Sequence, residues 1–279
     1  MSRIFDAVAA LRRRLGPGGR QVVNRLLYEA IYSVPAITRL GFFNGGHHPP
    51  PPGMLDVPAL AEARLEAALY DMALRVHPGP LDPPPARILD IGCGLGGGLL
   101  YAAALFPGAA LTGVDQSWRA VAGARRRLAA AGVGAAIRRA GGARLSFADA
   151  SFDLIAGIGS ATYVGYPEFL REASRLLAPG GVLTITAGTS FNRVEATRDR
   201  LAGLAAASGL ELRRFEDMTG PCFAALQLQA ARNAALIARL PGVLRGYAAE
   251  WAVLPGSRRH GLYLSGEKAE FGAVFAKTR

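Results

Sequence analysis

The fold of this chain is decided by the stretch Ile88-Leu89-Asp90-Ile91-Gly92-Cys93-Gly94-Leu95-Gly96-Gly97-Gly98. An apolar run ends in an acid and a cluster of glycines, and the residues that follow, 99–105, favour helix. This pattern predicts a buried strand, a tight turn and a helix start. Glycine allows positive φ and close approach of a ligand, and a helix start offers unpaired N–H groups. A nucleotide-like ligand is therefore the first hypothesis.

The glycine spacing alone does not identify the nucleotide. Gly92, Gly94 and Gly97 match the G-x-G-x-x-G spacing of dinucleotide-binding turns, but a glycine-rich turn without a ligand could show the same spacing. Asp90 precedes the first glycine, and Asp115 ends the next predicted strand. An acid at that separation can reach the hydroxyl pair of a ribose, so the two carboxylates make the ligand hypothesis more specific.

The chain is strongly basic, but the kind of basic residue it uses gives little support to nucleic-acid binding. The net charge is +11 over 279 residues, a balance that invites such a partner. Lys268 and Lys277 are the only lysines, and the bias towards Arg, Ala, Gly and Pro is typical of a GC-rich genome. Because zinc-finger spacing and RNA-binding signatures are absent, we expect no nucleic-acid partner.

Cysteine usage and hydropathy point to a soluble cytoplasmic protein. Cys93 and Cys222 are the only cysteines, so a disulfide framework is not expected. No secretory h-region opens the chain, and the apolar span 99–114 is too short and interrupted to insert stably in a membrane. His47 and His48 lack a third ligand at useful spacing, so no metal is expected. The sequence leaves a homodimer open.

Hydrophobic periodicity divides the chain into a helical N-terminal part and an α/β part. Helices are expected over 3–15, 22–37 and 60–76, and the proline-rich linker 78–85 marks the boundary. From residue 86, strands expected at 88–91, 110–114, 134–139, 152–158 and 182–187 alternate with helices. Such alternation predicts a parallel sheet with helices on both faces and a ligand at the carboxyl ends of its strands. A strand at 210–215, a long helix at 223–251 and a final strand at 271–276 are expected after it.

Four motifs, in order, resemble those of class I S-adenosylmethionine (SAM)-dependent methyltransferases. The first is the glycine turn after Asp90, and the second is the acid in Val114-Asp115-Gln116-Ser117. The third is Leu145-Ser146-Phe147-Ala148-Asp149-Ala150-Ser151-Phe152-Asp153, and the fourth is Arg175-Leu176-Leu177-Ala178-Pro179-Gly180-Gly181. The first two motifs also fit a nicotinamide-binding protein, but the other two do not. Residues 44–47, 262–267 and 275–277 are more loosely similar to phthiotriolone-type and related polyketide O-methyltransferases.

The resemblance implies an α/β, Rossmann-like fold with a mostly parallel sheet of seven strands, of which the last is antiparallel. It implies a helical lid over 1–85 and a SAM-binding domain over 86–279, with 218–256 as a helical lid insertion. The expected function is transfer of a methyl group from SAM to a small apolar natural-product acceptor, and the expected site of methylation is an oxygen atom.

The family's cofactor contacts transfer to nine positions of this chain. Gly92, Gly94 and Gly96 would let the backbone approach the cofactor, Asp90 would hold the turn and the amino group, and Asp115 would bind the ribose hydroxyls. The predicted set is completed by residues near the adenine and along the turn: Cys93, Gln116, Leu145 and Ile158.

The acceptor is expected to contact aromatic side chains, namely Phe43, Tyr163, Tyr166 and Phe223. Two departures from the family concern chemistry. Gly141-Gly142-Ala143 stands where relatives often have an acid that contacts adenine, and Ile158 and Ala161 stand where relatives often have an acid and a catalytic histidine.

Three hypotheses account for the missing base. The acceptor is already acidic or a good nucleophile, such as a phenol, an enol or an amine. Alternatively His47, or His48 beside it, is the base, because histidine is the usual proton acceptor near neutral pH. In the third, the chain no longer methylates and acts as a cyclase that uses the methyltransferase pocket to shape a polyketide.

Overall fold

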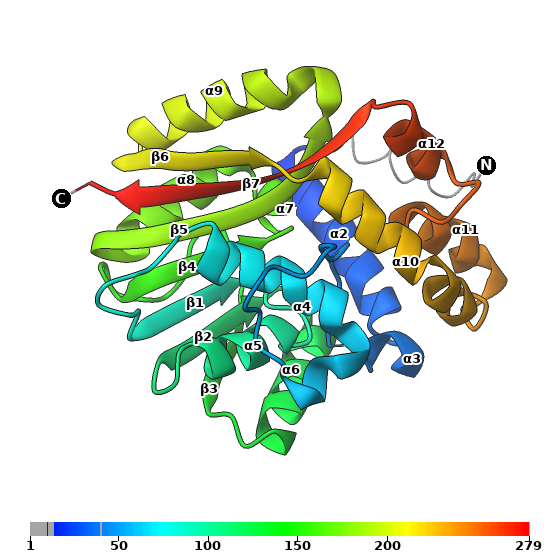
Figure 1. Cartoon of the computed structure of the whole chain (residues 1–279), viewed down its shortest axis with the longest axis horizontal. Coiled ribbons are helices and arrows are strands. Elements are labelled where there is room, and N and C mark those ends of the chain that lie inside the picture. Colours follow the sequence, from blue (N-terminus) through cyan, green and yellow to red (C-terminus); the bar gives the residue numbers. More distant parts are fainter. Residues whose placement is uncertain (1–9, 11–13, 40, 279) are drawn as a thin grey trace.

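The computed structural model describes residues 10, 14–39 and 41–278. Its centre is a seven-stranded sheet of order β3-β2-β1-β4-β5-β7-β6, with helices on both faces (Figure 1). The strands are β1 (Arg87–Ile91), β2 (Ala110–Asp115), β3 (Ala135–Arg139), β4 (Phe152–Ile158), β5 (Leu177–Ser190), β6 (Leu210–Asp217) and β7 (Lys268–Lys277). The first five pair in parallel, and β7 runs antiparallel between β5 and β6. The predicted fold class is confirmed.

Helices precede the sheet, connect its strands and fill the interval between β6 and β7. They are α2 (Pro17–Ile31), α3 (Pro35–Thr38), η1 (Pro58–Ala63), α4 (Arg64–Asp71), η2 (Met72–Val76), α5 (Gly97–Leu105), α6 (Trp118–Ala130), α7 (Ala161–Val164), α8 (Tyr166–Leu176), η3 (Phe191–Arg193), α9 (Val194–Ala206), α10 (Thr219–Ile237), α11 (Gly242–Trp251) and α12 (Arg258–Leu264). The helix predicted over 3–15 falls mostly on residues outside those described.

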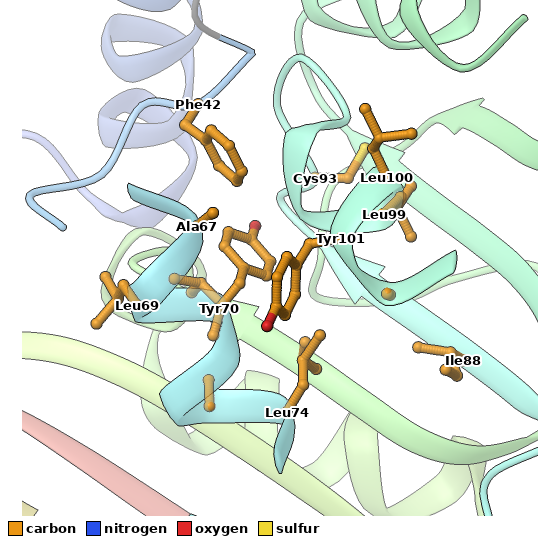
Figure 2. Packing of buried hydrophobic residues seen from close by; sticks show 14 of the residues in the cluster. Phe42, Ala67, Leu69, Tyr70, Leu74, Ile88, Cys93, Leu99, Leu100 and Tyr101 are labelled. Carbon is orange, nitrogen blue, oxygen red and sulfur yellow. The ribbon is translucent and has the colours of Figure 1, made fainter. Parts of the chain in front are cut away.

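The central strands are buried on both faces, which explains why their sequences are continuously apolar. In β1, Ile88 packs with α4 and α5 on one face, and the next residue, Leu89, packs with α8 and α9 on the other. Figure 2 shows the first of these clusters, to which α4 contributes Tyr70 and α5 contributes Tyr101. Of the predicted N-terminal lid, residues 60–76 therefore belong to the cover of the sheet.

The long helix predicted over 223–251 is two helices, α10 and α11, that meet near Pro241. Proline has no N–H to donate and disfavours a helical residue before it, so the break falls there. The helical segment between β6 and β7 also continues to Leu264, beyond the predicted lid boundary at residue 256. In Figure 1, α10, α11 and α12 lie together at the end of the sheet where β7 (red) begins.

The register of β7 decides which side chains reach that end of the sheet. Lys268 pairs with Ser190 and Glu270 pairs with Gly188, both near the carboxyl end of β5. Because β7 is antiparallel, its first residues lie at the edge where the parallel strands end. The fold thus brings residues from the last part of the described chain to the same edge of the sheet as the glycine turn after β1, with β4 and β5 between them.

Candidate active site

A cavity of about 350 Å³ opens at the carboxyl ends of the parallel strands. Its floor is built from the ends of β1, β2, β4 and β5 and from the start of β7. Its walls come from α2, the loop after α3, and α10 to α12. Open α/β sheets bind ligands at this edge, so the cavity is the candidate active site.

The glycine turn after β1 forms one end of the cavity floor. Gly92 has φ +84°, and a Cβ there would lie 2.5 Å from Cβ of Ser160. The amides of Gly92 and Cys93 both donate to the carbonyl of Val114, at 2.8 and 3.1 Å, which ties the turn to β2. A side chain at residue 92 would therefore distort the backbone and collide with a neighbour, and glycine keeps the turn flush with the cavity.

Asp115 presents a fixed carboxylate beside this turn. Its Oδ2 accepts a hydrogen bond from the amide of Gly94 at 3.0 Å, and its Oδ1 accepts one from the amide of Ser117 at 2.8 Å. Burial raises the pKa of Asp115 to about 6, although these amide bonds oppose the increase. A carboxylate has about four acceptor positions, so Asp115 keeps capacity for hydroxyl donors of a ligand in the cavity.

Asp90 lies buried at the base of the turn with one oxygen unsatisfied. Its Oδ2 accepts a hydrogen bond from the hydroxyl of Tyr70 at 3.1 Å, whereas its Oδ1 has no hydrogen-bond partner. Burial raises the pKa of Asp90 to about 7. An unpaired carboxylate in such a place is costly, and a cationic ligand group would remove much of that cost.

Aromatic side chains form the roof over the cavity. Phe43, after α3, stacks on Trp251 of α11 with 3.6 Å between ring centroids and 19° between planes. Tyr28 of α2 meets both Phe43 and Tyr163 edge-on, with centroids 5.7 Å apart in each pair. The roof thus joins α2, α7 and α11, which are distant in sequence.

A polar cluster lies at the opposite end of the cavity from Asp115. Its members, which we call the β7 cluster, are Arg259, Tyr263, Lys268 and Glu270. The Lys268 ammonium lies 3.4 Å from Oε1 of Glu270, and the Tyr263 hydroxyl donates to the same oxygen. Burial lowers the pKa of Lys268, and burial together with Glu270 raises the pKa of Tyr263. These are charged and polar groups in an otherwise largely apolar chamber.

Most of the predicted site residues line the cavity: Gly92, Cys93, Gly94, Asp115, Gln116, Ile158, Phe43 and Tyr163. Asp90 is buried and does not line the cavity, although the two residues that follow it do. Gly96 instead begins α5, where a Cβ would lie 3.1 Å from Cβ of Ala124, so this glycine serves helix packing. Leu145 is buried in the core on the α8 side, and its amide donates to Glu172. Neither residue lines the cavity.

Three predicted acceptor or catalytic residues also lie outside the cavity lining. Tyr166 is the first residue of α8. Phe223 stacks on the ring of Tyr263, with 5.0 Å between the ring centroids. His47 is buried with its Nδ1 2.9 Å from the carbonyl of Pro49, and burial lowers its pKa. Because His47 does not line the cavity, the structure gives no support to its predicted role as the base.

The sequence prediction missed the β7 cluster, Tyr28 of α2 and Tyr32, which directly follows α2. One signal was available for the cluster, since Lys268 is one of two lysines in an arginine-rich chain. In the described part of the chain, no group of three or more His, Cys, Asp or Glu side chains could hold a metal ion. Within those residues, no helix is both long and apolar enough to cross a bilayer.

A family model described as "Methyltransferase domain" matches residues 88–181, which comprise β1 to β4, α8 and the first part of β5. This chain contains a class I methyltransferase domain. The family and fold expected from the four motifs are thereby confirmed, and the glycine turn and Asp115 both lie within the matched region.

Curated relatives of the domain include two mycobacterial methyltransferases. The fatty-acid O-methyltransferase of Mycolicibacterium smegmatis is 36% identical over 101 residues, or 36% of each chain. The phthiotriol/phenolphthiotriol dimycocerosates methyltransferase 1 of Mycobacterium ulcerans is 32% identical over 118 residues, or 42% of this chain and 43% of that protein. The alignments span less than half of either relative.

Solved structures extend the likeness to nearly the whole chain, at the level of the fold. The geranyl diphosphate C-methyltransferase of Streptomyces coelicolor, solved with geranyl diphosphate and S-adenosyl-L-homocysteine, aligns with TM-score 0.68 and 19% identity. The alignment covers 93% of this chain and 98% of that one. The [4+2]-cyclase SpnF aligns with TM-score 0.67 and 19% identity, and the alignment covers 93% of this chain and 97% of the cyclase. At 19% identity these alignments show a shared fold. A shared fold does not indicate which of the two reactions, methyl transfer or cyclisation, this chain catalyses.

Proposed function

We propose that this protein is a SAM-dependent methyltransferase that methylates an oxygen atom of a small, largely apolar acceptor. The observation that carries the proposal is the pairing of a flush glycine turn with a fixed carboxylate, Asp115, at one end of a cavity over the sheet. The curated relatives named above support methyl transfer within lipid metabolism.

The residues at the cofactor end fit SAM. Asp115 would accept hydrogen bonds from the ribose hydroxyls, and the unpaired Oδ1 of Asp90 would meet the positive charge of the ammonium group. When bound there, SAM supplies an electrophilic methyl group on a sulfonium. The protein's part is then to hold the acceptor oxygen in line with that methyl group and to exclude water.

The acceptor end fits a molecule with a large apolar surface. Its walls include Phe43, Tyr163, Leu226 and Trp251 beside the β7 cluster. We assign a lid role to α2 with the loop 41–46 and to the helices between β6 and β7, which together cover the cavity. A cytoplasmic location, with Cys93 and Cys222 reduced, and a homodimer remain predictions.

A cyclase on the methyltransferase fold is the second candidate. The residues after β4 offer no histidine or carboxylate: Ser160, Ala161 and Thr162 follow Gly159. An aromatic chamber without a base at that place suits the folding of a polyene as well as methyl transfer. The cyclase predicts ring closure that proceeds without turnover of SAM.

Calorimetric titration with SAM and with S-adenosylhomocysteine tests the proposal. We expect micromolar dissociation constants for both compounds, and formation of S-adenosylhomocysteine when an acceptor is present. The absence of binding at millimolar concentrations would contradict a methyltransferase. Binding of the cofactor with ring closure that does not consume it would favour the cyclase.

A further inference from the structure

We propose that the acceptor oxygen belongs to a carboxylate, held by Lys268 and Arg259 at the β7 end of the cavity, and that the product is a methyl ester. This inference rests on the proposed function and names its substrate class. It is carried by the geometry of the β7 cluster, by its balance of charge and by the absence of a base in the cavity wall after β4.

The ammonium of Lys268 is held only by weak contacts. Its contacts are all long: 3.4 Å to the carbonyl of Thr189, 3.3 Å to that of Ala269 and 3.4 Å to Glu270. Charge-assisted N–H···O bonds are ordinarily 2.7–2.9 Å. An ammonium that is largely withdrawn from water yet held only by long contacts is poised for a closer anionic partner.

Gly188 makes room for this ammonium inside the cavity. A Cβ at residue 188 would lie 2.0 Å from Nζ of Lys268 and 2.8 Å from Oε1 of Glu270. Lys268 therefore lies across the end of β5, over the backbone of a residue that itself lines the cavity. The side chain reaches into the chamber because β5 carries no side chain at that point.

Arg259 adds a second cation to the same end. Its guanidinium contacts the carbonyl of Trp251 at 3.4 Å, and within the described residues no carboxylate forms an ion pair with it. Its charge contributes to lowering the pKa of Lys268, so the two cations are neighbours. Among the residues that line this end of the cavity, two cations accompany one carboxylate, Glu270, which leaves an excess of one positive charge in the lining. Glu250, which accepts the backbone amides of Arg258 and Arg259, is buried outside the lining.

That excess suits an anion of single charge. A diphosphate would bring more negative charge than two cations already facing Glu270 can balance, whereas a carboxylate matches it. The adjacent walls, formed by Met218, Leu226, Val253 and Phe271, would receive an apolar tail. The chemistry that fits is therefore a carboxylic acid with a hydrocarbon or ring body.

A carboxylate also removes the need for the missing base. It is ionised at neutral pH, so its oxygen attacks the methyl carbon without losing a proton. One O–C bond forms, one C–S bond breaks, and the electron pair of the broken bond stays on the departing sulfur. Atoms and charge balance with no general base, which agrees with Ala161 at the position where relatives often have histidine.

The distances across the sheet allow both ends of the cavity to serve one reaction. β5 is the direct neighbour of β4, and β7 lies one strand further. Neighbouring strands are separated by about 4.8 Å, so the start of β7 and the end of β4, two strands apart, are separated by about 10 Å. A carboxylate that contacts Lys268 over β5 is thus within a few ångströms of the end of β4.

The test compares octanoate with three probes that share its tail: 1-octanol, octylamine and octyl phosphate. Binding of each is measured by calorimetry with S-adenosylhomocysteine present, and methylation is measured with SAM by mass spectrometry. We expect octanoate to bind at least tenfold more tightly than the other three and to be converted to methyl octanoate. Preferred methylation of octanol or octylamine, or tighter binding of octyl phosphate, would overturn the proposal.

Substitutions of Lys268 test the assignment within the site. Lys268→Met removes the charge and should raise Kd and KM for octanoate roughly 10- to 100-fold, the loss expected for a hydrogen bond to a charged group. Lys268→Arg should restore most of the affinity. The matched control is Lys277→Met, because Lys277 lies at the other end of β7 and donates to the carbonyl of Leu177. An equal effect of both Met variants would overturn the assignment.

Failure of this proposal is distinguishable from failure of the proposed function. Tight binding of S-adenosylhomocysteine without binding or methylation of octanoate would reject the carboxylate and leave a methyltransferase. Failure of S-adenosylhomocysteine to bind to the folded protein would reject both.

Discussion

The two ends of the cavity are built in different ways. The cofactor end is local: Asp90, the glycine turn and Asp115 lie within one strand–helix–strand unit and are tied together by backbone hydrogen bonds. The acceptor end is assembled from distant segments, since Gly188 lies near the end of β5, Arg259 and Tyr263 lie on α12, and Lys268 begins β7. A short motif can specify the first end, whereas only the order of the strands creates the second.

The difference predicts that the two ends can be disabled separately. The largest effect is expected for Asp115→Ala, which removes the proposed acceptor for the ribose hydroxyls and releases the amide of Gly94. Loss of two hydrogen bonds to a charged group should raise the Kd for S-adenosylhomocysteine roughly 100- to 1,000-fold by calorimetry. Asp56→Ala, which removes an exposed partner of Arg64, is the control and should leave the Kd unchanged. A similar Kd for the Asp115 variant and the wild type would show that the carboxylate does not bind the cofactor.

Changing the pH should weaken the cofactor end alone. The pKa of Asp90 is raised to about 7, and a cationic ligand group favours its ionised form. The Kd for S-adenosylhomocysteine should therefore level off about one pH unit above this pKa, rise through pH 7, and approach a tenfold increase per pH unit below it. Asp90→Asn should bind more weakly and show a shallower dependence on pH in the same range. An identical pH profile for variant and wild type would exclude Asp90 as the titrating group.

A methyl group on Gly188 should affect only the acceptor end. Gly188→Ala places a Cβ where the Lys268 ammonium lies, so Lys268 and Glu270 must move aside. Loss of part of a charged contact predicts a rise of about tenfold in KM for octanoate, with the Kd for S-adenosylhomocysteine within twofold of wild type. Gly203→Ala is the control, because a Cβ there on α9 meets no atom within 4 Å. Equal changes in both constants would mean that the ends are coupled.

The smallest effect is expected where the two ends share their roof. Trp251→Leu removes the stack on Phe43, a contact worth roughly 0.5–1.5 kcal/mol beyond burial in such pairs. The Kd for S-adenosylhomocysteine and the KM for octanoate should both rise about threefold, in keeping with the lower part of that range. A change confined to one constant would place the stack over that end only.

Prediction from sequence succeeded where structure is local. The run Ile88 to Ile91, the turn at Gly92 and the acid at Asp115 specify a strand, a turn and a neighbouring strand with little help from the rest of the chain. The alternation that follows fixes a parallel sheet, and the cavity lies at the predicted edge of that sheet.

Prediction was incomplete where the outcome depends on packing between distant segments. Gly96 and Leu145 belong to matching motifs, yet Gly96 packs against Ala124 and Leu145 lies in the core on the α8 side. His47 was predicted as the base, but it is buried in its loop and does not line the cavity. No local pattern places Lys268 opposite Ser190, because that pairing arises from insertion of β7 between β5 and β6.

The position of β7 also has a consequence for folding during synthesis. β6 leaves the ribosome before β7, and its partner in the sheet is β7. The edge of β5 that pairs with β7 therefore stays unpaired while residues 210–267 are synthesised. β1, β2 and β4 can pair much earlier, so a nascent chain would acquire a cofactor-binding half before the acceptor site exists. An unpaired strand edge of this kind is a recognised starting point for aggregation, and a cofactor bound early would steady the half that is already folded.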